Sequence, residues 1–176
     1  DYRGYGSSLG HPSVSSMMGD AKVIYDYFAG YLQDNAYEGP LYVMGRSLGA
    51  MSAMEVTATY QHSGGQFSVQ GMILESGAGI TMWDRWRPTE GDFERWDQMK
   101  ALYRSQVEGI TVPLLTIHGE VDELIPVDRA LETRELLGSA EKELLIIPGA
   151  GHNDIFLIGL SEYMQAVYDF VTQSRV

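Results

Sequence analysis

Apolar residues recur at helical spacing in several parts of the chain. Between residues 15 and 33 they lie three or four positions apart, which predicts a helix with Ser15 or Ser16 as its N-cap. Further helices are expected over 48–60 and near 127–137. The clearest apolar stripe predicts the final helix, and its members are Leu160, Tyr163, Met164, Val167, Tyr168 and Val171.

Short continuous apolar runs lie between these helices. They are too short for helices and are therefore predicted to be buried strands, at residues 41–44, 70–74, 112–117 and 143–147. Strands that alternate with helices need crossover connections, and these produce a parallel sheet with helices on both faces. We therefore predict a single α/β domain over residues 1–176.

Residues 78–110 depart from this alternation and contain all three tryptophans of the chain. We predict a small cap-like excursion between two strands. Two interpretations of it stay open. In the first, Trp83 and Trp86 line a substrate pocket. In the second, the tryptophans cover the core and bury apolar area there.

The composition narrows the class of protein. Hydrophobic residues make up 44% and charged residues 20%, the balance of a soluble globular domain, and no apolar run reaches the length of a membrane span. The formal charge of −12 argues against nucleic acid or an anionic membrane as a partner. The absence of cysteine excludes disulfides, thiolate metal sites and a cysteine nucleophile. It leaves the compartment open, with the cytoplasm favoured.

The segment Gly45-Arg46-Ser47-Leu48-Gly49 follows a predicted strand and opens a predicted helix. This is the context of a nucleophile elbow, in which the serine is exposed on a sharp turn at the carboxyl end of the sheet. We expect both glycines to be required, because side chains two positions before and after the serine would collide. The chain has 20 glycines, so the pattern alone arises easily by chance, and its place between strand and helix carries the prediction.

A serine hydroxyl needs a base that takes its proton and an acid that orients the base. Asp122 follows the predicted strand at 112–117, and His152 follows the predicted strand at 143–147. The chain order serine, acid, histidine brings all three residues to the same edge of such a sheet. We therefore predict that Ser47, Asp122 and His152 form a catalytic triad.

Other residues compete for these roles. Glu120 and Glu123 are close neighbours of Asp122 and are alternative acids, although position favours Asp122. The remaining histidines do not follow the last predicted strand, and we expect them to be surface or hydrogen-bonded residues: His11, His62 and His118.

Four segments together resemble the bud-emergence-type α/β hydrolases and the related palmitoyl-protein thioesterases. They are Asp-Tyr-Arg-Gly-Tyr-Gly at 1–6, Gly-Arg-Ser-Leu-Gly at 45–49, His-Gly-Glu-Val-Asp-Glu-Leu-Ile-Pro at 118–126 and Gly-His-Asn-Asp at 151–154. The resemblance implies the α/β-hydrolase fold and hydrolysis of an ester, thioester or amide through an acyl-enzyme. It also implies a small-molecule or acyl substrate and no metal or organic cofactor.

The same resemblance implies roles for further residues. Leu48 supplies one backbone N–H to an oxyanion hole. Arg46 is expected to form an ion pair near the elbow, and Asp154 is expected to be a cap or first-turn charge on the last helix. Arg3 is expected to anchor the glycine-rich loop at the start of the sequence.

The resemblance also implies strands that come before the loop at Asp1. Without them, the strand at 41–44 has an unpaired apolar edge. The second oxyanion donor, which such enzymes take from a loop after an earlier strand, is then missing as well. We expect an N-terminal segment or a second chain to complete the sheet.

The function expected from these observations is a serine hydrolase that cleaves an ester or thioester. A serine aminopeptidase or oligopeptidase of the same fold is the alternative, because the triad is shared and specificity depends on the cap and the pockets. A hydrolase-like scaffold without catalytic activity is a third interpretation.

Overall fold

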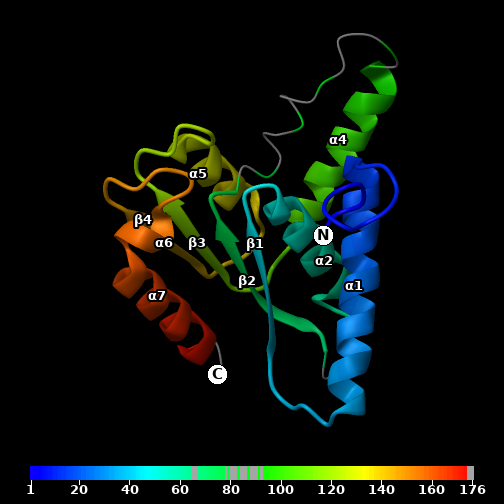
Figure 1. The fold of residues 1–176 in the computed structure, drawn as a ribbon, viewed down its shortest axis with the longest axis horizontal. Coiled ribbons are helices and arrows are strands. Elements are labelled where there is room, and N and C mark those ends of the chain that lie inside the picture. The colour runs from blue at the N-terminus through cyan, green and yellow to red at the C-terminus, as the bar shows by residue number, and fades with distance from the viewer. Residues whose placement is uncertain are drawn as a thin grey trace.

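The computed structural model describes residues 1–64, 67–77, 79, 83, 87, 91 and 93–173. Within these residues, one sheet contains four parallel strands in the order β1-β2-β3-β4 (Figure 1). Their bounds are Leu41–Arg46, Val69–Glu75, Leu114–Gly119 and Lys142–Ile147. The predicted strands and their parallel arrangement are therefore confirmed.

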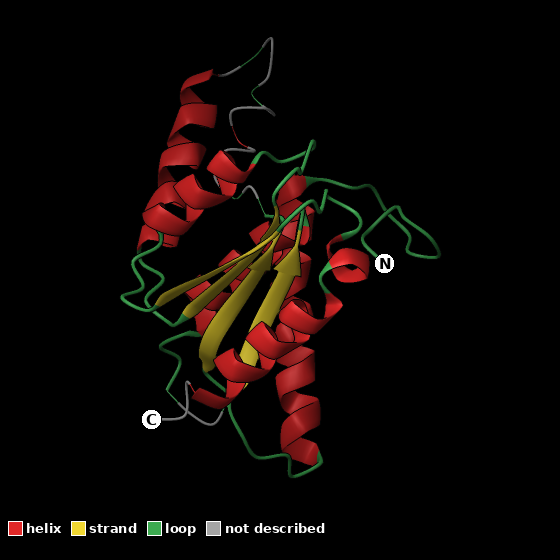
Figure 2. Cartoon of the chain, turned by 90° about the vertical axis from the view of Figure 1, so that its left-hand side faces the viewer, coloured by secondary structure: helices red, strands yellow, loops and turns green. Residues whose placement is uncertain are grey.

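The helices have the bounds α1 Val14–Asp34, α2 Gly49–Tyr60, α4 Phe93–Glu108, α5 Val127–Leu136, α6 Ile155–Ile158 and α7 Leu160–Gln173. Figures 1 and 2 show helices on both sides of the sheet. One core cluster joins the sheet to α1, α2 and α4, and a second joins it to α6 and α7. The predicted helices are confirmed.

Successive strand residues point to opposite faces of the sheet. On one face, Met72 and Leu74 of β2 pack in the same cluster as Met54 of α2. On the other face, Ile73 packs in a cluster with Phe170 of α7. Because both faces are buried, the strands appear in the sequence as continuous apolar runs.

Two contacts fix the start of α1. Ser13 is its N-cap, and its hydroxyl accepts a hydrogen bond from the Ser16 N–H at 3.0 Å, while the Ser16 hydroxyl accepts one from the Ser13 N–H at 3.1 Å. The expected cap at Ser15 or Ser16 was therefore wrong, because Ser16 is the reciprocal partner in a capping box. Arg3 donates two hydrogen bonds of 2.6 Å to Asp20 of α1, which confirms that Arg3 anchors the opening loop.

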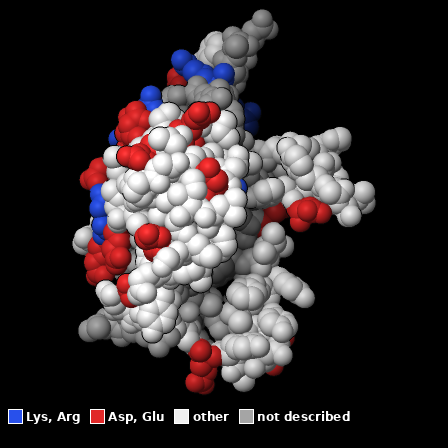
Figure 3. All heavy atoms as spheres, turned by 60° about the vertical axis from the view of Figure 1, so that its left-hand side comes forward, with Lys and Arg blue, Asp and Glu red and all other residues white. Residues whose placement is uncertain are grey.

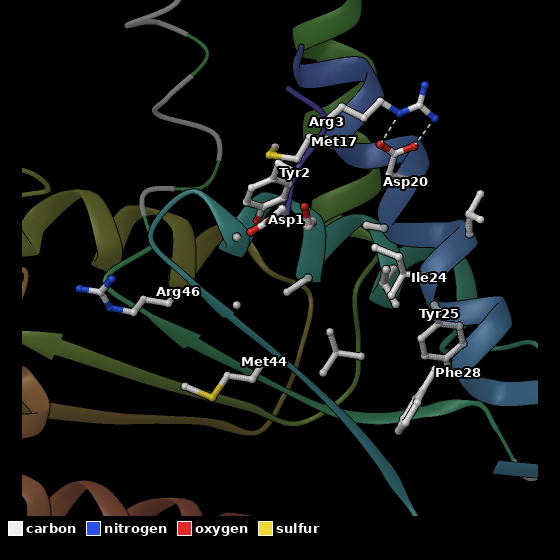
Figure 4. A pocket seen from close by; sticks show the side chains of 18 of the residues that line it. Asp1, Tyr2, Arg3, Met17, Asp20, Ile24, Tyr25, Phe28, Met44 and Arg46 are labelled. Atoms are coloured by element: carbon white, nitrogen blue, oxygen red, sulfur yellow. Dashed lines mark hydrogen bonds and ion pairs between the residues drawn. The ribbon is translucent and has the colours of Figure 1, made fainter. Parts of the chain in front are cut away.

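β1 is an edge strand in the described part of the chain, where it pairs only with β2. The expected unpaired edge is therefore confirmed for these residues. A cavity of about 800 Å³ lies between this edge and the helices α1 and α2. Figure 4 shows Ile24 and Phe28 of α1 and Met44 of β1 at the cavity. All three side chains are exposed.

The described part of the excursion consists mainly of α4. Trp83 is 4% exposed and packs against Trp96 and Tyr103, with ring centroids 5.0 Å and 5.5 Å apart. It is absent from the lining of the cavity beside β1. This supports the interpretation in which the tryptophans cover the core. Trp86 lies outside the described residues, and its predicted place in a substrate pocket stays a prediction.

The acidic side chains are spread over the surface that Figure 3 presents. Figure 3 shows Asp and Glu side chains at several separate places on the face that it presents, with few Lys and Arg side chains among them. In the part of the chain that the structure describes, no helix is both long enough and apolar enough to cross a membrane.

Candidate active site

The turn between β1 and α2 holds Ser47 in a left-handed backbone conformation. Its φ is +52°, a region that costs a non-glycine residue about 1–3 kcal/mol. The Ser47 N–H donates to the Glu75 carbonyl of β2 at 2.8 Å, and the Ala50 N–H donates to the Ser47 carbonyl at 3.1 Å. The serine is therefore fixed between the carboxyl end of β1 and the start of α2, as predicted for a nucleophile elbow.

The two glycines of the motif differ in what surrounds them. A Cβ on Gly45 would lie 2.4 Å from the Gly49 carbonyl oxygen and 2.7 Å from the Ala53 Cβ. A Cβ on Gly49 would meet the Tyr2 hydroxyl at 3.4 Å and, apart from its chain neighbours and the nearby backbone of α2, no other described atom within 4 Å. The expectation that both positions require glycine was therefore wrong for Gly49, which faces the opening loop instead of packed backbone.

We expect Gly45→Ala to lower the free energy of unfolding by about 1–3 kcal/mol, because the added methyl group forces the backbone of β1 and α2 apart. Gly49→Ala is the matched control. It is expected to change this free energy by less than about 1 kcal/mol, since alanine also favours the helix. Denaturant unfolding followed by circular dichroism measures both. Equal losses in the two variants would contradict the packing explanation.

The structure brings the three residues of the predicted triad together. Asp122 lies on the loop after β3, and His152 lies on the loop after β4. His152 Nε2 is 2.9 Å from Ser47 Oγ, and His152 Nδ1 is 2.8 Å from Asp122 Oδ2. Asp122 and His152 are 6% and 9% exposed. The hydroxyl, imidazole and carboxylate therefore form one continuous set of hydrogen bonds.

Several donors hold the Asp122 carboxylate in place. Its Oδ1 accepts hydrogen bonds from the Leu124 N–H at 3.0 Å and the Ile125 N–H at 2.8 Å. Burial acts to raise the pKa of Asp122, but the Ile125 N–H, the hydrogen bond with His152 and the nearby imidazoles of His152 and His118 together lower this pKa below its ordinary value. Asp122 is therefore a stable carboxylate at neutral pH.

The alternative acids and histidines are occupied elsewhere or exposed. Glu120 accepts a hydrogen bond from the Gly149 N–H at 2.9 Å, and Glu123 is exposed. His118 is fully buried, and its Nε2 donates to the Ile125 carbonyl at 2.8 Å. His11 and His62 are exposed. Among the described residues, the geometry therefore favours Asp122 and His152.

Leu48 is the N-cap of α2, directly after Ser47. The first N–H groups of a helix have no acceptor within the helix and carry the positive end of its dipole. In the described part of the chain, the Leu48 N–H forms no hydrogen bond with another backbone group. It is therefore available to a negatively charged oxygen beside Ser47, in agreement with the role that the family resemblance implies for it.

Two further charged residues support the loops of the site. The expected ion pair at the elbow is present, with Arg46 Nε 3.0 Å from Glu75 Oε1. Asp154 is not a side-chain cap: its Oδ1 accepts a hydrogen bond from the Gly151 N–H at 2.6 Å, and its side chain makes no capping bond to α6. This corrects the expected role on the last helix, because Asp154 stands at the N-cap position of the short helix α6 and its side chain closes the histidine loop.

Sequence reasoning missed two residues of the site: Glu75, and Tyr163, whose hydroxyl donates to Glu75 Oε2 at 2.9 Å. A charged residue directly after the apolar run at 70–74 is the signal for Glu75, because a carboxylate at the end of a buried strand needs partners. Tyr163 gave no such signal, since a tyrosine on the apolar stripe of a helix is an ordinary core residue.

The chain has the α/β-hydrolase fold, with a parallel sheet and a serine on the turn between a strand and a helix. It is 29% identical over 176 residues to alpha/beta hydrolase domain-containing protein 17B of Xenopus tropicalis, covering 100% of this chain and 56% of that protein. It is 26% identical over 185 residues to protein bem46 of Schizosaccharomyces pombe, covering 99% of this chain and 57% of that protein. The chain thus spans little more than half the length of these relatives.

A comparison with solved structures gives the same fold. The structure of a monoacylglycerol lipase from Paleococcus ferrophilus superposes with a TM-score of 0.64 at 17% sequence identity, covering 94% of this chain and 77% of the lipase. No protein-family model matches the sequence. Protein bem46 among the relatives agrees with the resemblance to the bud-emergence-type hydrolases, and this structural neighbour agrees with the fold.

Proposed function

We propose that the chain is the part of a serine hydrolase that carries its catalytic triad, and that it cleaves an ester or thioester through an acyl-enzyme. The observation that supports this most directly is the position of His152, whose two ring nitrogens lie within 3 Å of Ser47 Oγ and Asp122 Oδ2. A base placed between a hydroxyl and a carboxylate is the arrangement that activates a serine nucleophile.

In the proposed first step, His152 Nε2 accepts the Ser47 proton while Oγ attacks the carbonyl carbon of the substrate. The Asp122 carboxylate accepts the Nδ1–H hydrogen bond and stabilises the imidazolium that forms. The negative charge that develops on the carbonyl oxygen is placed next to the Leu48 N–H. A second donor, from a loop after an earlier strand, stays a prediction.

The tetrahedral intermediate then collapses. His152 gives its proton to the departing alkoxide or thiolate, and the acyl group stays on Ser47 Oγ as an ester. In the second half of the reaction, water attacks this ester and His152 takes the proton of the water. When that intermediate collapses, the proton returns to Ser47 Oγ and the carboxylic acid is released. Ser47 and His152 are thereby restored.

An ester or thioester is preferred as the substrate over a peptide for a chemical reason. Alcohols and thiols are better leaving groups than amines, and a peptidase of the exo-acting type also needs a group that holds the substrate amine. The structural neighbour named as a monoacylglycerol lipase supports the ester class by analogy alone. The finer substrate preference depends on the cap and is left to measurement.

Labelling with a fluorophosphonate tests the proposal, because the reagent reacts with a serine only when a base activates it. We expect the native chain to be labelled and Ser47→Ala to remain unlabelled. Ser63→Ala, which removes an exposed serine after α2, is the matched control and is expected to label normally. A folded native chain that does not label would instead support the inactive scaffold.

A substrate panel then separates the classes of hydrolase. Short-acyl esters, acyl thioesters and aminoacyl amides are compared by kcat/KM on the same preparation, each with Ser47→Ala as the blank. Faster cleavage of the ester or thioester is the expected result. Preference for the aminoacyl amide would instead assign the chain to the peptidases of this fold.

A further inference from the structure

The guanidinium of Arg46 joins two parts of the site that are distant in the sequence. Its Nε donates to Glu75 Oε1 at 3.0 Å. Its Nη2 donates to the His152 backbone carbonyl at 2.7 Å and to Asn153 Oδ1 at 3.1 Å. Figure 4 shows this side chain at the cavity beside β1, directed away from α1. Arg46 precedes Ser47 directly, so one rigid group connects the backbone of the nucleophile with the backbone of the base.

Glu75 is itself held on both sides. It ends β2 and is 7% exposed, and its Oε2 accepts a hydrogen bond of 2.9 Å from the Tyr163 hydroxyl of α7. Burial and the hydrogen bond to Glu75 raise the pKa of Tyr163, so its hydroxyl remains a donor at neutral pH. Both carboxylate oxygens therefore have partners, and Glu75 is a fixed counter-ion for Arg46.

We propose that Arg46 is a positioning residue for His152, held in its orientation by Glu75 and Tyr163. The proposal rests on the proposed function. It follows from the loop on which His152 lies, which is tied on one side by the Gly151 N–H bond to Asp154 and on the other by the carbonyl bond to Arg46. Loss of the second tie lets the imidazole move, and a displacement of about 1 Å at a reacting group costs about a hundredfold in rate.

The geometry requires arginine at this position. Nε and Nη2 point to different groups from one planar fork, whereas a lysine has one nitrogen and cannot reach Glu75 and the His152 carbonyl with the same fixed geometry. The charge is balanced as well. Glu75 pairs with the guanidinium, so the positive charge beside the histidine loop has a buried counter-ion.

The test compares Arg46→Lys with Arg104→Lys. Arg104 is the matched control because its Nε also donates to a glutamate, Glu108, at 2.9 Å, but on the exposed surface of α4. We expect Arg46→Lys to lower kcat for an activated ester about 10- to 100-fold and to leave KM within about twofold. In a His152→Ala background the same substitution is expected to have no further effect. Arg104→Lys is expected to change neither constant.

A second measurement does not depend on activity. The proton of the hydrogen bond between His152 Nδ1 and Asp122 gives an NMR resonance that is assigned by its loss in His152→Ala. We expect this resonance to shift or broaden in Arg46→Lys and to stay in place in Arg104→Lys. Tyr163→Phe removes only the hydroxyl that holds Glu75, and it is expected to change kcat and the resonance in the same direction by a smaller amount.

The outcomes separate the two proposals. Ser47-dependent turnover with an unchanged resonance and unchanged kcat in Arg46→Lys would overturn the positioning role and leave the hydrolase intact. A resonance that moves in Arg46→Lys, in a chain without Ser47-dependent turnover, would overturn the hydrolase and keep the positioning role. If Arg46→Lys does not fold, Tyr163→Phe decides, and native kcat with an unmoved resonance in that variant would overturn the positioning role of Arg46.

Discussion

Ser47→Ala and His152→Ala are each expected to lower turnover by several orders of magnitude, on the order of 10⁴ to 10⁶. The nucleophile and its base act as one unit, since His152 Nε2 is hydrogen-bonded to Ser47 Oγ. Removing the second residue after the first therefore costs little more. The measurement is kcat for an activated ester in both single variants and in the double variant.

The control for this comparison is His62→Ala, which removes an exposed histidine and is expected to keep native turnover. Losses that add in the double variant would show that Ser47 and His152 do not share a mechanism. Equal residual activity in Ser47→Ala, His152→Ala and the double variant would point to a contaminating esterase. Mass spectrometry of the labelled protein identifies that case.

Asp122→Asn is expected to lower turnover by about 10⁴, because an amide next to Nδ1 favours the wrong imidazole tautomer and does not stabilise the imidazolium. The carboxamide has the same shape as the carboxylate, and its oxygen can still accept the N–H bonds of Leu124 and Ile125. The fold is therefore expected to be retained. Glu123→Gln is the control, since Glu123 is exposed. If Glu123→Gln loses activity as Asp122→Asn does, the acid has been assigned to the wrong residue.

Asp122→Asn is also expected to change the stability of the fold in acid. The folded protein holds the pKa of Asp122 below its ordinary value of 3.8. A lowered pKa contributes stability that is fully present above 3.8 and is lost as the pH falls below it, toward the pKa of the folded state. Over that range, we expect the native chain to lose more unfolding free energy than Asp122→Asn does. Denaturant unfolding at neutral and acid pH measures the difference.

The layers of the fold and the three residues at its edge could be predicted from the sequence. Strands buried on both faces produce apolar runs, and a helix that covers a sheet produces an apolar stripe, so β1 to β4 and α7 left direct signals. Ser47, Asp122 and His152 each follow a different strand, and parallel strands end at one edge. Chain order and strand position were therefore enough to bring them together.

The remaining parts of the site depend on contacts between residues that have no characteristic spacing in the sequence. The position of Glu75 between Arg46 and Tyr163 follows from the sheet order and from the packing of α7, and neither sets a fixed distance along the chain. Asp154 turns back to Gly151, although its place before a helix is typical of a cap. Gly45 is tightly packed and Gly49 is not, and this difference depends on the path of α2, which the motif does not specify.

The left-handed backbone of Ser47 has a consequence for how such a chain evolves. A glycine at this position would adopt the same φ without strain, and would therefore relieve about 1–3 kcal/mol of folding free energy. Glycine has no hydroxyl, so the substitution that most easily relaxes the turn is also one that ends the proposed chemistry. At residue 47 greater stability and greater activity are thus mutually exclusive, which is the stability–function trade-off reduced to one backbone angle.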